Sequence, residues 1–367
     1  MEIPAIQKER KPVNTYRIVQ IVLGVLFSAY LIWRFAQVLI IKPIYGPDTW
    51  LRFAFAGLIL GSVYALIAIG YTLVYGILFM INFAHGDIMM LGAFGGFFLL
   101  EALKSIQVGT ADNPLSFLNA HPIISIAAAF LVGTLVAAVS GYFLERIAYR
   151  PLRSAPRLVP LISAIGASIF LENAAQLLFG AQRRDYANPD VIARGAGWEI
   201  SIGGGTVILT YTGVITIVLS FMIMVVLFLL VQRTQLGRAM RAVAENKQVA
   251  ALMGIDVDGV ISKTFIISGL LAGAAGVMWG IHLGLVYYYV GFLPGIKAFT
   301  AAVLGGIGNI PGAMLGGLFL GIVESLGPPI LGLSFQLKDV IAFTILVLIL
   351  IFRPTGILGE VLSEEKV

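Results

Sequence analysis

Long runs of apolar residues, each close to the length that crosses a bilayer, constrain this chain more than any other feature. A spanning helix needs about 20 predominantly apolar residues. One such run extends from about Ile18 to Ile41, and further apolar blocks follow it along the chain. We therefore expect an all-α, polytopic integral membrane protein with about ten transmembrane or half-spanning helices. The further blocks lie at 53–80, 88–103, 122–144, 158–180, 206–231, 264–285, 297–309, 311–326 and 336–352.

The composition excludes a water-soluble fold. Hydrophobic residues make up 59% of the 367 residues and charged residues only 12%, whereas about 25% of the residues in an average soluble domain are charged. A soluble chain of this size has too little polar surface to cover that apolar content. A cytosolic enzyme, a disordered chain and a nucleic-acid-binding module are therefore excluded.

Clustered basic residues predict the orientation of the helices. The connector 145–157 holds four arginines against Glu145, and the connector 232–263 holds three arginines and two lysines. Cytoplasmic connectors are enriched in Lys and Arg, so both connectors are expected in the cytoplasm. Counting spans outward from them places the N-terminus, the 81–87 turn and the C-terminus inside.

Signatures of catalysis and of metal binding are missing from the sequence. It contains no Gly-x-x-x-x-Gly-Lys-Ser/Thr loop, no Gly-x-Ser-x-Gly elbow and no His-Glu-x-x-His helix, and it has no cysteine. The three histidines His85, His121 and His282 are far apart along the chain. We expect no catalytic residue, no metal ligand and no cofactor, and an intramembrane hydrolase would need a nucleophile–base pair that we do not find.

Polar residues inside apolar blocks mark a candidate translocation path, because such residues are costly in lipid unless they face protein or water. Glu172, with Asn173 beside it, has two interpretations: an interhelical hydrogen bond or a role in the path. The Asn82–Asp87 turn is either a structural helix break or a lining of the path. The stretch 305–312 splits the two short blocks, which form either two short spans or one broken, re-entrant element. The candidate path residues are Asn82, His85, Asp87, Glu172, Asn173, Gly305, Gly306 and Asn309.

Glycines spaced four residues apart form potential helix-packing grooves, since small residues let two backbones approach closely. Gly57 and Gly61, and Gly317 and Gly321, are examples. The grooves are interpreted first as helix contacts, with sliding and gating as the functional alternative.

The segment 237–255 is the clearest local signal outside the apolar blocks. It predicts one short alanine-rich helix that Gly254 terminates. Its small apolar residues with a basic rim favour docking into a groove of another protein over a simple solvated connector.

This segment and three other blocks resemble the LivH-type permeases of branched-chain amino-acid ABC importers. The matching blocks are GYTLVYGILFMINFAHGDIMMLGAF (70–94), YRPLRSAPRLVPLISAIGASIFLEN (149–173), the 237–255 segment, and FTAAVLGGIGNIPGAMLGGLFLGIVE (299–324). Their order and spacing agree with that family from about 53 to 358. The resemblance implies the ABC-importer permease fold, with 53–358 as the permease domain. Residues 1–52 go beyond the usual family pattern and are expected to form a cytoplasmic leader and an extra span, and 359–367 a cytoplasmic tail.

The resemblance also implies partners: a homologous second permease, two cytoplasmic ATPases that bind the ATP, and an extracytoplasmic binding protein, at a prokaryotic inner membrane. The coupling role falls on 232–263, although Val249 stands where the general permease loop has Glu. A permease for urea or short amides shares these blocks and remains an alternative, as does a stand-alone secondary transporter or channel. The implied ATPase-coupling residues are Arg238, Arg241, Ala242, Glu245, Ala250, Ala251 and Gly254.

Overall fold

A computed structural model describes most of the chain. The predicted basic leader, with Lys8, Arg10 and Lys11, and almost all of the predicted tail lie outside the described residues. The same holds for Arg157 of the basic connector. The described residues are 15–38, 45–108, 115–153, 155–156, 158–353 and 355–359.

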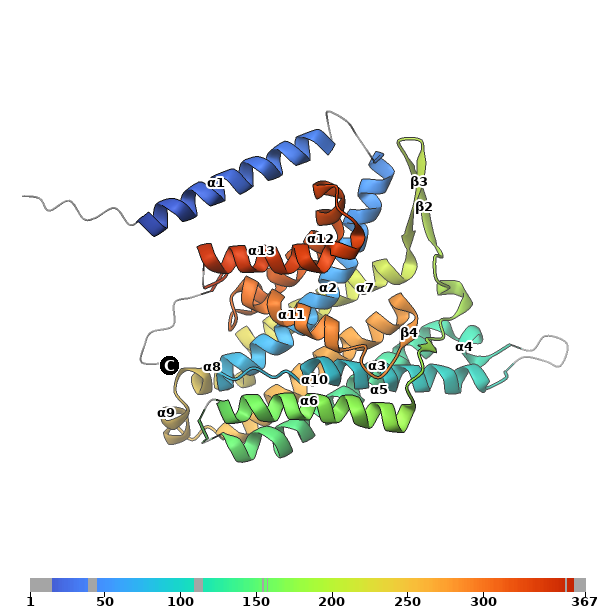
Figure 1. The fold of residues 1–367 in the computed structure, drawn as a ribbon. Helices are drawn as coiled ribbons and strands as arrows, with labels where there is room; N and C mark the ends of the chain where they lie inside the picture. Colours follow the sequence, from blue (N-terminus) through green and yellow to red (C-terminus); the bar gives the residue numbers. More distant parts are fainter. Residues whose placement is uncertain are drawn as a thin grey trace, which may run out of the picture.

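The described chain is a bundle of helices that lie roughly along one direction (Figure 1). Short irregular turns follow α5, namely the π-helix η2 (Glu145–Tyr149) and the 3₁₀-helix η3 (Arg150–Leu152). Two further 3₁₀ turns are η4 (Asp190–Ile192) and η5 (Phe335–Leu337). The α-helices are α1 (Thr15–Ala36), α2 (Pro47–Leu78), α3 (His85–Ser105), α4 (Phe117–Ala120), α5 (Pro122–Leu144), α6 (Leu158–Phe179), α7 (Tyr211–Arg233), α8 (Gln235–Glu245), α9 (Lys247–Leu252), α10 (Val257–Leu283), α11 (Phe292–Gly305), α12 (Ile310–Leu331) and α13 (Lys338–Phe352).

Eight helical stretches of the described chain are long and apolar enough to cross a membrane. Two shorter apolar stretches, 24–36 in α1 and the whole of α11, accompany them. The prediction of about ten transmembrane or half-spanning helices in an all-α fold is thereby confirmed.

The two short blocks left open by the sequence form two separate helices. α11 has 14 residues, which gives a length of about 21 Å, less than the roughly 30 Å of a hydrocarbon core. α12 has 22 residues and is long enough to span. α11 is therefore half-spanning by length, and α12 is a full span.

Short strands lie at the end of the bundle opposite α8 and α9 (Figure 1). β2 (Gly197–Ile202) and β3 (Gly205–Thr210) form an antiparallel hairpin in which Gly197 pairs with Thr210. β1 (Arg184–Asp185) pairs with β4 (Leu285–Val286). The start of the predicted apolar block 206–231 is thus a strand, because its β-branched residues pair across the Gly203–Gly204 turn. Helix α7 begins only at Tyr211, where the Thr210 hydroxyl accepts a hydrogen bond from the Gly213 N–H.

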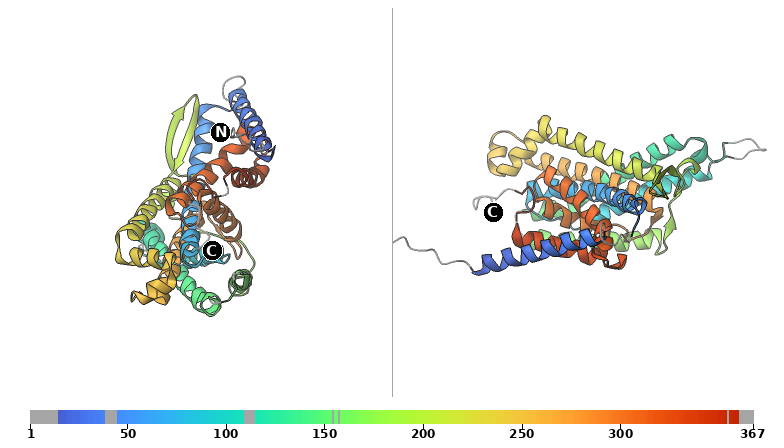
Figure 2. Two further views of the ribbon diagram at one scale, coloured as in Figure 1. Left: turned by 90° about the vertical axis from the view of Figure 1, so that its left-hand side faces the viewer. Right: turned by 90° about the horizontal axis from the view of Figure 1, so that it is seen from above.

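Close helix contacts at glycine form the core of the bundle. A Cβ built on Gly317 of α12 would lie 2.3 Å from the Cα of Ala65 of α2. A Cβ on Gly92 of α3 would lie 2.6 Å from the Cα of Gly273 of α10. No larger residue fits at either crossing, so the spacing of small residues reflects helix packing. The left panel of Figure 2 looks along the bundle. In that view α1 lies beside the red C-terminal helices α12 and α13 at one edge of the bundle, and the green α6 lies near the opposite edge.

Candidate translocation and coupling sites

The break between α2 and α3 brings polar residues into the interior of the bundle. Phe79 ends α2 in the left-handed region, with φ of 57°, and its N–H donates to the Tyr75 carbonyl. The chain then runs back along α2, so that the His85 ring lies against Gly70. Gly70 precedes the end of α2 by eight residues, or about 12 Å. α3 therefore begins inside the bundle rather than at its end.

The polar side chains of this break have different surroundings. The Tyr149 hydroxyl donates to Oδ1 of Asn82 at 3.0 Å. His85 is fully buried, with its Nδ1 3.3 Å from the Ser268 hydroxyl. These contacts tie Asn82 to the end of η2 and His85 to α10. Both residues therefore hold the break in place.

Asp87 is the residue of the break that faces an open space. Its Oδ2 accepts a hydrogen bond of 2.5 Å from the Ser168 hydroxyl of α6. Both residues line a cavity of about 320 Å³ between α2, α3, α6 and α11. Glu172, one helical turn beyond Ser168, lines the same cavity. The structure thus brings together Asp87 and Glu172, two candidate path residues that are 85 positions apart in the sequence.

Other candidate path residues lie elsewhere. Asn173 is exposed, and its side-chain amide donates to the Ile169 carbonyl of its own helix at 2.7 Å. Gly305 and Gly306 pack against backbone of 312–313 and 358–359. Asn309 caps α12 by accepting from the Gly312 N–H at 3.0 Å, and donates to the Leu358 carbonyl. The predicted path residues therefore do not form one site.

Asn309 instead lines a second cavity, of about 450 Å³, near the end of α2. Tyr75 and Phe79 line its α2 side, and Arg241 and Glu245 of α8 line another side. This cavity places the turn before α12 next to the predicted coupling segment. Residues of α8 therefore share one cavity with the end of α2 and the start of α12.

The predicted coupling helix is two helices rather than one. α8 ends at Glu245, and α9 starts again at Lys247. Asn246 stands between them in an extended conformation, and its Oδ1 accepts hydrogen bonds from the backbone N–H groups of Gln248 and Val249. An asparagine at such a position satisfies free N–H groups and starts a new helix. This explains why the segment forms two helices where one was predicted. Gly254, with φ of 80°, lies just past the end of α9, where it was expected.

Only part of this segment can meet a partner. Ala250 is 3% exposed and packs inside the protein, and the Arg241 guanidinium donates to the Val231 carbonyl in the last turn of α7. Arg238, Arg241, Glu245, Ala251 and Gly254 are exposed, whereas Ala242 is half-buried. Within this segment the most exposed apolar side chains are Leu252 at 87% and Met253 at 77%, and Val249 nearby is 53% exposed. We call Val249, Leu252 and Met253 the α9 tip. Their exposure was not anticipated from the sequence.

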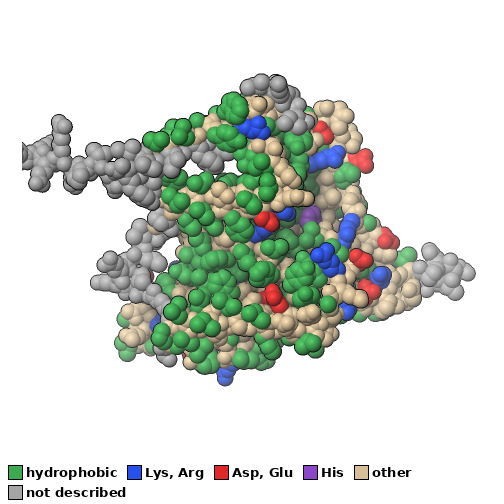
Figure 3. Space-filling model, in the orientation of Figure 1, with side chains coloured by type: hydrophobic (Ala, Val, Ile, Leu, Met, Phe, Trp, Pro, Cys, Tyr) green, Lys and Arg blue, Asp and Glu red, His purple; other side chains and the backbone are tan. Residues whose placement is uncertain are grey.

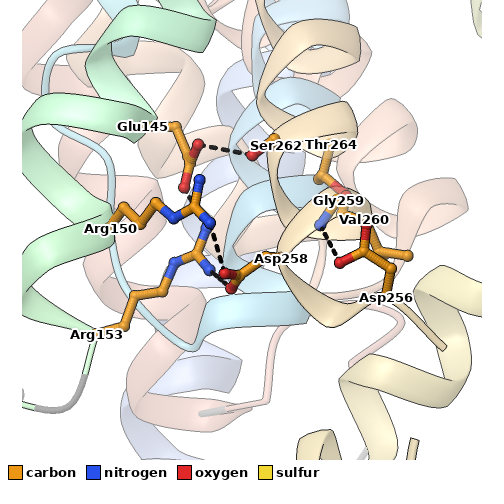
Figure 4. Close-up of polar contacts among 9 residues, drawn as sticks. All are labelled: Glu145, Arg150, Arg153, Asp256, Asp258, Gly259, Val260, Ser262 and Thr264. Atoms are coloured by element: carbon orange, nitrogen blue, oxygen red, sulfur yellow. Dashed lines mark hydrogen bonds and ion pairs between the residues drawn. The ribbon is translucent and has the colours of Figure 1, made fainter. Parts of the chain in front are cut away.

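A network of ion pairs holds the turns η2 and η3 and the following Arg153 beside the start of α10 (Figure 4). Glu145 is fully buried, pairs with Arg153 and accepts a hydrogen bond of 2.8 Å from Ser262 of α10. Arg153 also pairs with Asp258 in the first turn of α10, and Arg150 pairs with Asp258 at 2.7 Å. The predicted basic cluster therefore also has a structural role, because it fixes the end of α5 to the start of α10.

A second cluster of charges was missed by the sequence reasoning. Lys297 of α11 is buried and lies 2.8 Å from Glu324 of α12 and 2.6 Å from Asp339 of α13. The Tyr64 hydroxyl of α2 donates to the other oxygen of Glu324 at 3.0 Å. The signal for it was present, since Lys297 is a lysine at the start of an apolar block.

The surface agrees with a membrane environment for the middle of the bundle. In the face shown, hydrophobic side chains cover the central region, and most charged side chains gather toward the end that carries the strands (Figure 3). Exposed apolar residues on α6 and α7, such as Leu177 and Val226, belong to helices with little burial. These faces suit contact with lipid or with other membrane helices.

Comparison with known proteins identifies the family. Residues 53–350 match the family described as branched-chain amino acid transport system / permease component. The permease protein BraD of the high-affinity branched-chain amino acid transport system of Pseudomonas aeruginosa is 47% identical over 305 residues, which cover 83% of this chain and 94% of BraD. The permease protein LivH of the corresponding Escherichia coli system is 45% identical over 313 residues, 85% of this chain and 96% of LivH.

More distant proteins share the same region. A probable LivH permease of Methanocaldococcus jannaschii is 28% identical over 82% of this chain. No solved structure matches the chain. Both the family pattern and the 45–47% identical relatives cover most of the sequence. The chain therefore belongs to the branched-chain amino acid transport system permease family, as a non-catalytic, multi-pass membrane subunit of a multi-subunit ABC transport system.

Proposed function

We propose that this chain forms half of the membrane path of an ATP-driven importer for branched-chain amino acids. The observation that carries the proposal is the 45–47% identity, over most of both chains, to permease proteins named for high-affinity branched-chain amino acid transport. In this proposal a homologous second permease supplies the other half of the path. Two cytoplasmic ATPases and an extracytoplasmic binding protein complete the importer.

The cavity between α3, α6 and α11 supports this path. It lies between helices and combines apolar walls with Asp87, Ser168 and Glu172, which is the usual composition of a small-molecule site. Ile165 and Ile169 at its α6 side are 43% and 55% exposed. A second permease subunit packed against α6 would therefore close the cavity from outside.

The uptake assay that tests this function uses the assembled complex in proteoliposomes with its binding protein and internal ATP. Labelled leucine is expected to accumulate, and excess unlabelled isoleucine and valine to reduce that accumulation, whereas excess urea leaves it unchanged. Inhibition by urea or by short amides, without inhibition by isoleucine, would assign the importer to the amide class instead.

The α9 tip is proposed as the contact with an ATPase. It is apolar and exposed, and it lies at the end of the bundle away from the strands. A ligand or partner shifts a conformational equilibrium only through its different affinity for the two states. A docked α9 transmits such a shift to α8, and through the second cavity to α2 and α12.

Replacing Leu252 and Met253 together by serine tests this contact. Leucine uptake is expected to fall at least tenfold, and the ATPase subunits are expected to dissociate from the purified complex more readily, because a hot spot of apolar area is lost. Val191→Ser, which removes a 64% exposed apolar side chain from the turn η4 between β1 and β2, serves as the control. Normal uptake and normal ATPase retention in the double variant would place the docking site elsewhere. Ala250 is unsuitable for such a test, because it is buried.

The division of the chain belongs to the same proposal. The permease domain is taken as 53–358, and the family pattern begins at the same residue, 53. α1 precedes it as an added span, and its Arg34 donates to the Leu331 carbonyl at the end of α12 at 2.9 Å. With α8 and α9 in the cytoplasm, the N- and C-termini are cytoplasmic at the inner membrane.

A further inference from the structure

The cavity between α3 and α6 contains buried carboxylate oxygens without a partner. Asp87 is 1% exposed, and its Oδ1 accepts no hydrogen bond. Oε1 of Glu172 is also buried without a hydrogen-bond partner. A buried polar oxygen that has lost water and gained no donor is destabilising. Two such oxygens on one cavity therefore point to a ligand that supplies donors.

The cavity itself provides no cation to satisfy them. No lysine, arginine or histidine is among its lining residues in the described part of the chain. The position of Asp87 in the first turn of α3 favours a negative charge there, because the N-terminus of a helix carries a partial positive charge. The missing partner is therefore a positively charged group of the ligand.

The remaining walls indicate what the cation is attached to. Ile165, Ile169 and Ile296 are aliphatic, and Phe292 and Phe83 present aromatic rings. A metal ion would want several oxygen ligands, and no group of three or more His, Asp or Glu side chains in the described residues could hold one. The volume of about 320 Å³ suits a small organic molecule.

We propose that this cavity binds a primary ammonium group between Asp87 and Glu172, with the branched aliphatic part of the same molecule against Ile165, Ile169 and Ile296. The proposal rests on the function proposed above and deepens it, since branched-chain amino acids carry both groups. Uncharged amides have no ammonium group to offer the two carboxylates. The cavity is therefore a second point of selection, after the binding protein.

Thermal unfolding of the detergent-solubilised complex, without binding protein, tests the recognition directly. A ligand that binds only the folded state raises the unfolding temperature. At 10 mM, L-leucine and 3-methylbutylamine, which keep the ammonium group, are expected to raise it by about 2 °C. 4-Methylpentanoate has the same branched chain but no ammonium group, and it is expected to cause less than a third of this shift. Equal shifts for all three compounds, or none, would overturn the proposal.

Variants of the two carboxylates connect the shift to the cavity. Asp87→Asn and Glu172→Gln are each expected to abolish at least two thirds of the shift with 3-methylbutylamine. Glu101→Gln removes an exposed carboxylate from the same helix as Asp87 and is expected to keep the full shift. Glu172 is only half-buried, so its variant tests the site even if Asp87→Asn does not fold. A full shift in Glu172→Gln would overturn the assignment.

Leucine uptake by the wild-type complex separates this inference from the proposed function. If leucine is taken up but the shift does not depend on the carboxylates, the ammonium site is wrong and the proposed function stands. If leucine is not taken up while 3-methylbutylamine still binds through Asp87 and Glu172, the ammonium site stands and the proposed substrate is wrong.

Discussion

At the scale of single residues, the buried charges of Lys297 and Glu324 are held by opposite charges on other helices. Lys297 is 5% exposed and Glu324 is 1% exposed, and their charged atoms are 2.8 Å apart. Lys297 also pairs with Asp339, and Glu324 also pairs with Lys338 at 3.1 Å. Removing one member of this cluster unbalances the charges in a low-dielectric interior, which is more costly than losing a pair at the surface. Such pairs therefore fix which helices are neighbours.

Glu145 offers a direct measurement of this effect. Glu145→Ala removes the buried carboxylate that pairs with Arg153 and accepts from Ser262. We expect the free energy of unfolding to fall by about 3 kcal/mol, measured by chemical or thermal unfolding in detergent. Glu101→Ala breaks an exposed pair with Lys104 and is expected to cost less than about 1 kcal/mol. Similar costs for the two variants would contradict a structural role for the Glu145 network.

The lowered pKa of Lys247 predicts that the stability of the protein depends on pH. Burial, followed by repulsion from Arg153, lowers the pKa of Lys247 below its ordinary value. In the unfolded chain its pKa returns to about 10.4, so between the two values the unfolded state binds more protons. Stability therefore rises with pH through this window.

The Lys247→Gln variant isolates that contribution. Its unfolding temperature is expected to equal or exceed that of the wild type at pH 7, and the wild type is expected to gain relative to the variant as the pH approaches 10. Lys104→Gln, at an exposed position on α3, should show no such change. A variant that is less stable than wild type at pH 7 would mean that the Lys247 charge is stabilising.

At the scale of elements, the packing of α2 against α12 depends on the absence of side chains. Gly317 and Gly321 of α12 face Ala65 and Gly61 of α2, with the helix backbones in contact. In a membrane, such close packing replaces the hydrophobic effect as the force that joins helices. The same geometry joins α3, α5 and α10 at Gly92, Gly133 and Gly273.

A matched pair of glycine substitutions tests this packing. Gly321→Ala places a Cβ 2.2 Å from the backbone nitrogen of Gly61, and we expect a loss of about 1–3 kcal/mol in unfolding free energy. Gly166→Ala in α6 adds a Cβ with nothing within 4 Å, and it is expected to stabilise by roughly 0.5–1 kcal/mol through helix propensity. Unfolding in detergent measures both. If Gly321→Ala is tolerated as well as Gly166→Ala, the close approach is not required.

At the scale of the whole molecule, the two ends of the bundle differ in what they present. α8 and α9 stand at one end, and the β2–β3 hairpin with the β1–β4 pair stands at the other (Figure 1). The ion-pair network of Glu145, Arg153 and Asp258 ties the first end together. This asymmetry agrees with a motor on one side of the membrane and delivery of substrate on the other.

The lack of cysteine makes this orientation easy to measure, because each introduced cysteine is then unique. Gln248→Cys in α9 and Glu199→Cys in β2 are both at exposed positions. In spheroplasts, a membrane-impermeant maleimide is expected to label the cysteine introduced at position 199 and not the one at position 248. Inverted membrane vesicles are expected to show the reverse. Labelling of both positions from one side would contradict the proposed topology.

Much of the architecture was predictable from local sequence. Apolar run length predicted the spans, because every backbone polar group in lipid must be paired within a helix. The end of α9 at Gly254 was also predictable, since only glycine adopts that φ of 80° without strain. The split at Asn246 was missed, although an asparagine that can cap N–H groups is a local signal for it.

What the sequence by itself determined is therefore the environment, the number and type of helices, and the family. What only the tertiary structure decided is which polar residues meet. Asp87 and Glu172 share a cavity, Asn173 faces outward, and Lys297 pairs with Glu324. The physical reason is that helix formation depends on hydrogen bonds between neighbours in the chain. The meeting of two side chains depends instead on helix rotation and crossing, which are set by close contacts such as Gly321 against Gly61.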